Sequence, residues 1–182
     1  PFGWKEIEGV HNRGDWDLSN HSKHSGKELK YDGYYPHIIE TSGGVDRGFL
    51  SFLIDAYQEV EGGRTKTTQA VKEMEVVLKL HKKLAPVKVA VLPLLKNKPE
   101  LVKKAKDVYR SLKPYFAVQY DEADSIGRRY RRQDEIGTIF CLTVDFETLE
   151  KDDLTIRDRD TMKQERVGIK DLIDTLKDKL ES

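Results

Sequence analysis

Residues 39–60, IETSGGVDRGFLSFLIDAYQEV, place several polar groups directly before an apolar segment. Glu40 could hold an amine, and Arg47 could reach a phosphate or stack on a flat ring. A strand that turns through Ser42 and two glycines into a helix would expose backbone N–H groups and the positive end of the helix dipole. This arrangement suits an anionic ligand. On spacing alone, however, a tight glycine turn with Asp46 and Arg47 paired to neighbouring side chains is the somewhat favoured explanation, because two adjacent glycines are common in loops.

The N-terminal residues 3–21 contain further groups that could bind phosphate or metal. Arg13 could contact a phosphate, and four carboxylates could coordinate a phosphate-bound magnesium ion: Glu6, Glu8, Asp15 and Asp17. A zinc site would need His11, His21 and His24, but their spacing fits no compact ligand pair on one helix and no cysteine is near. We therefore expect solvated loop histidines.

Residues 128–132, RRYRR, place four arginines and a tyrosine within little more than one helical turn. Such a cluster could bind phosphates while Tyr130 stacks on a base, as single-stranded RNA recognition often requires. The alternative is that the arginines pair with the acidic residues on both sides, Asp121, Asp124, Asp134 and Glu135. The sequence leaves both interpretations open.

The overall composition limits these possibilities. The 182 residues include 32 basic and 32 acidic side chains, so the net charge is zero and any site for a polyanion must be local. The one cysteine, Cys141, lies in an apolar, strand-like context, which favours a buried structural thiol over a nucleophile and fits a reducing cytosol. Neither a Ser-His-Asp order nor a phosphate-binding loop is visible, and no apolar run is long enough to span a membrane, so we expect a soluble protein.

The elements that must position these residues change in character near Pro86. Before it, we expect a polar loop over residues 11–37, a short strand over 35–40 and a largely buried helix that ends at the glycines of residues 61–65. Residues 67–86 are ambiguous, because their first half resembles a helix while VVLKLH could be a strand.

After Pro86, strands and helices alternate. We expect strands at 87–95, 115–121 and 138–145, helices at 99–113 and 125–137, a strand pair within 153–167 and a final helix at 168–180. This order predicts an α/β domain over residues 86–182 whose mixed sheet has a parallel portion closed by an antiparallel hairpin.

Four stretches together resemble one family. PFGWKEIEGVHNRGDWDLSNHSKHSGKEL, PHIIETSGGVDRGFLSFLIDAY, KLAPVKVAVLPL and SIGRRYRRQDEIGTIFCLTVDFETL occur in the order found in glycyl-tRNA synthetase of the homodimeric class II, bacterial type. The resemblance implies that residues 1–85 are the C-terminal part of a class II catalytic domain, an antiparallel sheet with the motif 3 helix. It also implies that residues 86–182 are the anticodon-binding domain. The first residues, PFGWKEIEG, include no initiator Met, basic leader or signal-like apolar stretch, so we expect that the sequence begins inside a longer protein or that an upstream part was removed.

The resemblance further implies ATP-dependent glycine activation, with Mg2+, followed by transfer to tRNA(Gly). Glu40 and Ser42 match the glycine-binding positions, with Thr41 in place of the usual proline, and Arg47 matches the motif 3 arginine on ATP. Glu6 and Arg13 match family residues that line the ATP side of the pocket, and Glu6 is also expected to lie near the magnesium ion bound to ATP. The roles implied are therefore catalytic for Arg47 and Glu6, and ATP-binding for Glu6, Arg13 and Arg47.

For tRNA binding, the resemblance gives a shortlist of four arginines. We expect one or two of them to contact tRNA and the others to be structural: Arg128, Arg129, Arg131 and Arg132. The parent protein is expected to be a cytoplasmic homodimer with no membrane or DNA partner. Class II catalysis also needs motif 1, which builds the dimer interface, and motif 2, whose arginine binds the α-phosphate. Neither is found in this chain, so we expect it to be inactive alone. A non-catalytic tRNA-binding module and a synthetase-derived accessory protein stay open as alternatives.

Overall fold

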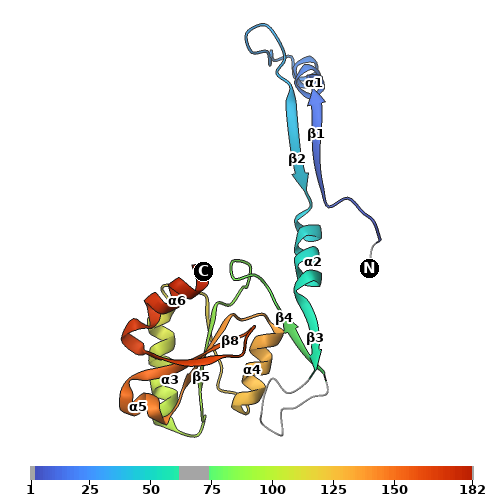
Figure 1. Ribbon diagram of the computed structural model, residues 1–182. Coiled ribbons are helices and arrows are strands. Elements are labelled where there is room, and N and C mark those ends of the chain that lie inside the picture. Colours follow the sequence, from blue (N-terminus) through green and yellow to red (C-terminus); the bar gives the residue numbers. More distant parts are fainter. Residues whose placement is uncertain (1–2, 62–73, 182) are drawn as a thin grey trace. The chain divides into compact units, whose positions relative to one another are not determined.

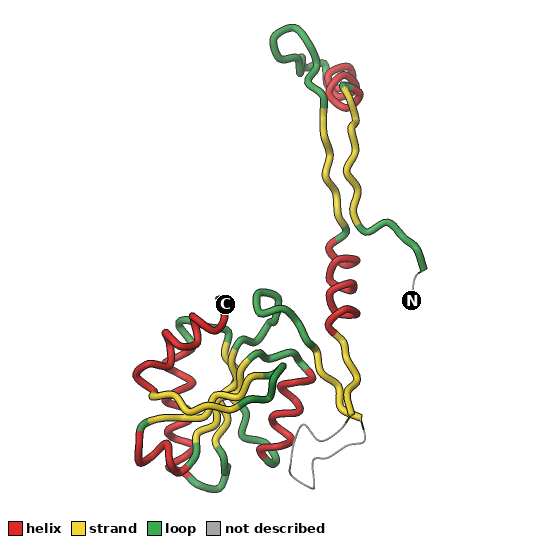
Figure 2. Tube along the Cα trace, in the orientation of Figure 1, coloured by secondary structure: helices red, strands yellow, loops and turns green. Residues whose placement is uncertain are grey.

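The computed structural model describes residues 3–61 and 74–181 (Figures 1 and 2). Contacts within the chain group it into two compact units, Pro1–Phe52 and Leu53–Ser182. The domain boundary that the sequence suggests, between residues 85 and 86, stays a prediction. None of the helices in the described ranges is long and apolar enough to cross a membrane.

The N-terminal unit is built on a two-stranded antiparallel ribbon. Its elements are β1 (Glu8–Gly14), α1 (Trp16–Ser25), β2 (Ile38–Gly43) and the beginning of α2 (Val45–Ala56). Within the ribbon, Glu8 lies opposite Gly43 and His11 opposite Glu40, with an irregularity between Asn12 and Gly14. The expectation of a loop over residues 11–37 was wrong, since this range holds the end of β1 and all of α1. The expected strand at 35–40 begins at Ile38 instead.

The expectation of a largely buried helix was also wrong. The side chains of Phe49 and Phe52 are 65% and 55% exposed, and Ala56 is the one buried residue of α2. A two-stranded ribbon offers too little sheet surface to cover a long apolar helix face. The expected helix end at residues 61–65 was wrong too, because the helix ends at Ala56 and the chain continues directly as β3 (Tyr57–Glu61). The two glycines expected to stop the helix lie outside the described residues.

In the C-terminal unit, the end of α2 is followed by β3, which pairs antiparallel with β4 (Met74–Leu78) so that Tyr57 lies opposite Leu78. The strand interpretation of VVLKLH is thus confirmed as far as Leu78. The helix suggested for the first half of residues 67–86 falls largely on residues outside the described ranges.

The main sheet has the order β6-β5-β7-β8-β9. Its strands are β5 (Val89–Pro93), β6 (Val118–Tyr120), β7 (Phe140–Val144), β8 (Asp153–Asp158) and β9 (Gln164–Gly168). β6, β5 and β7 are parallel, while β7, β8 and β9 are antiparallel. The predicted α/β class and mixed sheet are confirmed.

Helices cover both faces of this sheet (Figure 1). They are α3 (Pro99–Leu112), α4 (Ile126–Glu135), α5 (Phe146–Lys151) and α6 (Leu172–Glu181), the last preceded by a 3-10 turn at Ile169–Asp171. Because side chains alternate along a strand, Val89 and Val91 join the large core with α3 and α6, whereas Ala90 and Leu92 face Ile126 and Tyr130 of α4. α3 and α4 therefore lie on opposite faces.

Local signals account for the helix ends. Pro99 opens α3, and Ser125 precedes α4 in an extended conformation. Gly137 follows α4 with φ of 80°, and a Cβ there would lie 2.8 Å from the Leu78 carbonyl oxygen, so both conformation and space require glycine. The short α5 was not predicted; Asp145 and Thr148 form a capping box at its start.

Candidate functional site

The carboxyl ends of the parallel strands carry a crevice. β5 leads to α3 on one face and β6 leads to α4 on the other, so the chain diverges at this edge. Ligands of open α/β sheets commonly bind at such a switch point. The pocket here has a volume of about 350 Å3, and its walls include Lys96, Asn97, Asp124, Ser125 and Arg129. It unites the loop after β5 with the start of the arginine-rich helix α4.

Arg129 forms the floor of this crevice. Its side chain is only 1% exposed and donates hydrogen bonds to the carbonyl oxygens of Pro93 and, at 3.0 Å, Asp124. Burial lowers the pKa of the Arg129 guanidinium. Arg129 therefore ties the end of β5 to the loop before α4, which is a structural role.

Arg132 is held by two carboxylates. It lies 2.8 Å from an oxygen of Asp121 and 2.8 Å from an oxygen of Asp124, and donates a further hydrogen bond to the Ala123 carbonyl. Burial opposes the charged form of Arg132, but the hydrogen bonds with Asp121 and Asp124 raise its pKa overall. This pairing is the alternative that the sequence left open, and it stiffens the loop between β6 and α4.

The remaining two arginines differ in exposure. Arg128 has a side chain that is 52% exposed, and its nearest carboxylate is Asp124 at 3.7 Å. Arg131 is half-buried and takes part in an interaction within the protein. Of the four arginines that the sequence singled out, Arg128 is thus the most available to a ligand.

Tyr130 does not offer its ring to a base, which contradicts the stacking hypothesis. Its hydroxyl lies 2.5 Å from the Thr143 hydroxyl, and the Arg157 guanidinium sits over its ring, 4.9 Å from the centroid. Burial raises the pKa of Tyr130. The ring is therefore part of the packing between α4 and the sheet.

Two buried arginines outside the cluster were missed by sequence reasoning. Arg157 on β8 makes a two-pronged ion pair with Asp134 on α4, at 2.8 and 2.9 Å, with both side chains at most 3% exposed. Arg159 donates to the carbonyl oxygens of Gly137 and Leu80, both at 2.9 Å, and to that of Leu78 at 3.2 Å. In the sequence, DLTIRDRD indicated only one strand of an expected pair; the structure places Arg157 in β8 and Arg159 just after its end.

Cys141 matches its prediction. Its side chain is 2% exposed, and burial raises the pKa of the thiol to about 12. A thiol that stays protonated is a poor nucleophile. The interpretation of a buried structural cysteine is confirmed.

In the N-terminal unit, two pairs of the predicted substrate residues come together. Arg13 lies 3.0 Å from a Glu40 oxygen and makes a two-pronged contact with Asp17, at 2.5 and 2.8 Å. Hydrogen bonding to Asp17 is the main cause that raises the pKa of Arg13. The carboxylate predicted to hold an amine is thus already in contact with a cation.

Arg47 is the second meeting point. Its guanidinium donates to the Glu6 carbonyl oxygen at 2.5 Å, across the end of the ribbon from the start of α2. Ser42 pairs with Gly9 in the ribbon and is exposed. Glu6 is also exposed, and among the described residues no three His, Cys, Asp or Glu side chains are grouped to hold a metal. A magnesium contact by Glu6 stays a prediction.

Comparison with known proteins agrees with this architecture. A family model described as an anticodon binding domain matches residues 88–179. Proteins named glycine--tRNA ligase from Chlorobaculum tepidum and Clostridium kluyveri are 52% and 49% identical over 99% and 100% of this chain. The chain spans 38% of the length of each.

A solved structure gives the same picture for the fold. Prolyl-tRNA synthetase from Cryptosporidium parvum, complexed with halofuginone and AMPPNP, aligns with a TM-score of 0.54 and 25% identity. The alignment covers 57% of this chain and 22% of the synthetase. Since the matched residues cover the whole five-stranded sheet and all but the last residues of its helices, the chain belongs to the anticodon-binding domain family, as its sequence predicts.

Proposed function

We propose that the chain is part of a glycine–tRNA ligase and that its C-terminal unit contacts the anticodon of tRNA(Gly). The observation that carries this proposal is about half identity to proteins named glycine--tRNA ligase across the whole chain. The parent protein would use ATP and Mg2+ to form glycyl-adenylate and would transfer glycine to tRNA(Gly). We expect that parent to be a cytoplasmic homodimer.

The crevice at the carboxyl edge of the sheet is the proposed RNA contact. Arg128 lies beside it with an exposed side chain, and its pairing with Asp124 at 3.7 Å is a surface ion pair of small energetic value. A phosphate or base edge could therefore replace Asp124 at low cost. Arg129 and Arg132 act through position, because they hold the loop that presents Arg128. Arg131 is kept as a second candidate for RNA contact.

Glu40, Ser42, Arg47 and Glu6 are the proposed contacts of the adenylate-forming reaction. Glycine has no side chain to grip, so selectivity must come from charges that hold its amine and from walls that exclude a β-carbon. Glu40 and Ser42 would bind the amino acid, while Arg47 and Glu6 would bind ATP. In adenylate formation the glycine carboxylate attacks the α-phosphate in line, which calls for positive charge and Mg2+ rather than a protein nucleophile.

The contacts of Arg13 suggest a modified role. Its guanidinium is shared between Asp17 and Glu40, so it is suited to orient the Glu40 carboxylate. A carboxylate held on one side by arginine still has a free lone pair for an ammonium group. We therefore propose Arg13 as a positioning residue for glycine binding, in addition to the ATP contact that the sequence suggests.

The RNA contact can be tested on this chain directly. Binding of a tRNA(Gly) transcript, followed by fluorescence anisotropy at fixed salt, should weaken when the anticodon is changed and when Arg128 is replaced by alanine. Lys163→Ala is the matched control, since Lys163 is exposed and precedes β9 at the opposite edge of the sheet. Equal affinity for tRNA(Gly) and the anticodon variant would refute anticodon recognition.

Catalysis can be tested separately. We expect no glycine-dependent exchange between ATP and pyrophosphate with this chain alone. Exchange activity of the isolated chain would overturn the proposal that residues beyond it complete the active site. A full-length ligase that contains this sequence should catalyse the exchange, and the substitution Glu40→Gln in it should abolish the exchange.

A further inference from the structure

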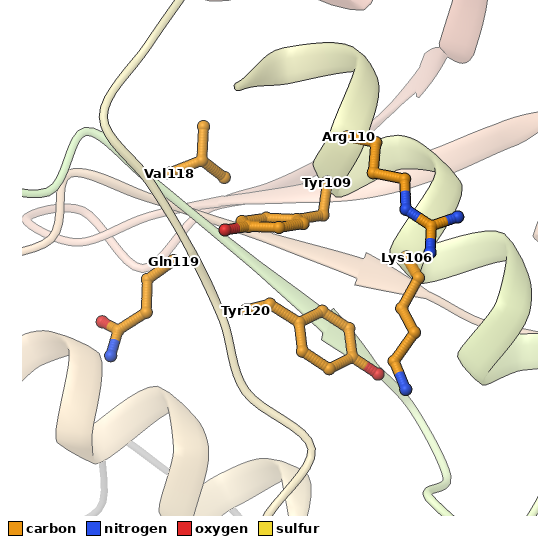
Figure 3. A pocket seen from close by; sticks show the side chains of 6 residues that line it. All are labelled: Lys106, Tyr109, Arg110, Val118, Gln119 and Tyr120. Carbon is orange, nitrogen blue, oxygen red and sulfur yellow. The ribbon is translucent and has the colours of Figure 1, made fainter. Parts of the chain in front are cut away.

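A second groove lies in the C-terminal unit, between α3 and the edge strand β6 (Figure 3). Its volume is about 460 Å3, within the range of sites that hold small ligands. Lys106, Tyr109 and Arg110 line it from α3, and Val118, Gln119 and Tyr120 line it from β6. It shares no lining residue with the crevice at the carboxyl edge.

The sequence spacing explains why these side chains meet. Lys106, Tyr109, Arg110 and Lys113 recur at helical spacing, so they lie on one flank of α3 and its continuation. Val118 and Tyr120 alternate with Gln119 along β6, which places Gln119 on the other side of the strand, where Gln133 of α4 donates to it at 3.2 Å. The groove therefore lies at the edge of the sheet, with the side chains of Val118 and Tyr120 on one side of β6 and that of Gln119 on the other.

Two aromatic rings form its floor. The centroids of Tyr109 and Tyr120 are 6.0 Å apart, with an angle of 56° between their planes. Glu122 accepts a hydrogen bond from the Tyr120 hydroxyl at 2.5 Å, which fixes that ring. Lys106 lies 5.5 Å from the Tyr120 centroid and Lys113 lies 5.9 Å from the Tyr109 centroid. Both rings are thus reached by cationic groups from solvent.

The charges around the rings favour an anion. Three cations, Lys106, Arg110 and Lys113, surround the rings, and two carboxylates pair with the first two of them: Glu122 with Lys106 and Asp107 with Arg110. Lys106 lies 3.7 Å from Glu122, and Arg110 lies 3.3 Å from Asp107 with side chains 72% and 53% exposed. Exposed pairs of this kind contribute little, so a phosphate could take the place of either carboxylate.

We infer that this groove binds an unpaired nucleotide of the RNA, with the base against Tyr109 or Tyr120 and a flanking phosphate at Lys106 and Arg110. Aromatic rings beside basic groups are the combination that single-stranded nucleic acid requires. The inference rests on the proposed tRNA contact and adds a second point of attachment outside the anticodon crevice.

A peptide that adds a strand to the sheet edge fits the groove less well. In the part of the chain that the structure describes, the outer edge of β6 has no partner strand, but β6 is only three residues long. Few backbone hydrogen bonds could form along it, and the basic and aromatic side chains would contribute little to them.

The test compares variants of this chain for binding to the tRNA(Gly) transcript across a series of salt concentrations. Tyr109→Leu keeps an apolar side chain where Tyr109 packs on the core and should weaken binding about tenfold, because one base loses its aromatic partner. Lys106→Gln should reduce the slope of log affinity against log salt by about one phosphate contact. Lys163→Gln should change neither, and circular dichroism melts establish that each variant is folded.

A short unstructured RNA provides the second arm. Loss of affinity in both groove variants, with discrimination of the anticodon intact, supports the inference. Unchanged affinity and salt slope in folded groove variants overturn it, even if tRNA(Gly) binds and Arg128→Ala weakens binding. If binding of the short RNA depends on Lys106 while changes to the anticodon have no effect, the proposed anticodon recognition is wrong and the inferred nucleotide binding in the groove is supported. No binding of either RNA, or binding of extended peptides alone, overturns both.

Discussion

The ion pair between Asp134 and Arg157 should be the most costly to break in the C-terminal unit. It joins α4, which carries the arginine cluster, to β8, and both side chains are at most 3% exposed. Replacing Arg157 by methionine leaves a buried carboxylate without its two-pronged partner. Breaking a buried pair in this way typically costs about 3–5 kcal/mol. For a unit of this size that loss corresponds to a fall in Tm of about 10–20 °C.

Thermal melts and urea unfolding followed by circular dichroism would measure this effect. The double variant Asp134→Leu with Arg157→Met should recover most of the stability, because exchange of both charges for apolar side chains of similar size is often nearly neutral. Arg110→Ala removes one member of an exposed pair and should leave Tm unchanged. A loss below about 1 kcal/mol for Arg157→Met would refute the view that this pair fixes α4 on the sheet.

Three further results are expected. The Cys141 thiol should react with a thiol reagent only after unfolding, and rapid labelling of the native chain at pH 8 would contradict its burial. Because its pKa is raised from 9.0 to about 12, its contribution to stability is complete below pH 9.0 and is lost as the pH rises towards 12. Arg159→Met should lower Tm by several degrees, since buried carbonyls of Leu80 and Gly137 lose a charged donor; an unchanged melt would show that water replaces it. In a full-length ligase, Arg13→Ala should raise KM for glycine more than KM for ATP, whereas the reverse would favour a direct ATP contact.

The α/β part of the chain was predictable chiefly because two of its strands, β5 and β7, are mostly apolar. β5 and β7 are buried at every position, and a parallel sheet covered on both faces requires such runs. Pro99, Ser125 and Gly137 marked the helix ends correctly. The short α5 was missed because six residues are too few for helical periodicity, although its capping residues were visible in the sequence.

The N-terminal part was less predictable, for two different reasons. α1 contains no buried residue and has no apolar stripe, so hydrophobic spacing could not reveal it. α2 does have an apolar face, with Phe49 and Phe52 on it, but an apolar pattern shows only that a helix can be covered. Whether another part of the protein covers this helix face depends on the surfaces of other elements, which the pattern within the helix does not show. The roles proposed for Glu40 and Ser42 rest on family resemblance, since their spacing alone fitted a plain turn as well as a ligand site.

The arginine cluster shows that helical phase can predict the direction of a side chain but not its hydrogen-bond partner. Ile126, Arg129, Tyr130 and Gln133 recur at spacings of three and four, so phase alone directs Arg129 towards the sheet and Arg128 away from it. A buried guanidinium is stable only if carbonyl or carboxylate oxygens meet it, and for Arg129 one of them is the Pro93 carbonyl at the end of another strand. That acceptor depends on tertiary structure and was invisible in the sequence. Helical phase thus sets the direction in which each arginine side chain points, and the fold supplies the oxygen that accepts from Arg129. A folded Arg129→Met variant should therefore lose RNA affinity only through altered presentation of Arg128. Arg128→Ala should lose RNA affinity at unchanged Tm.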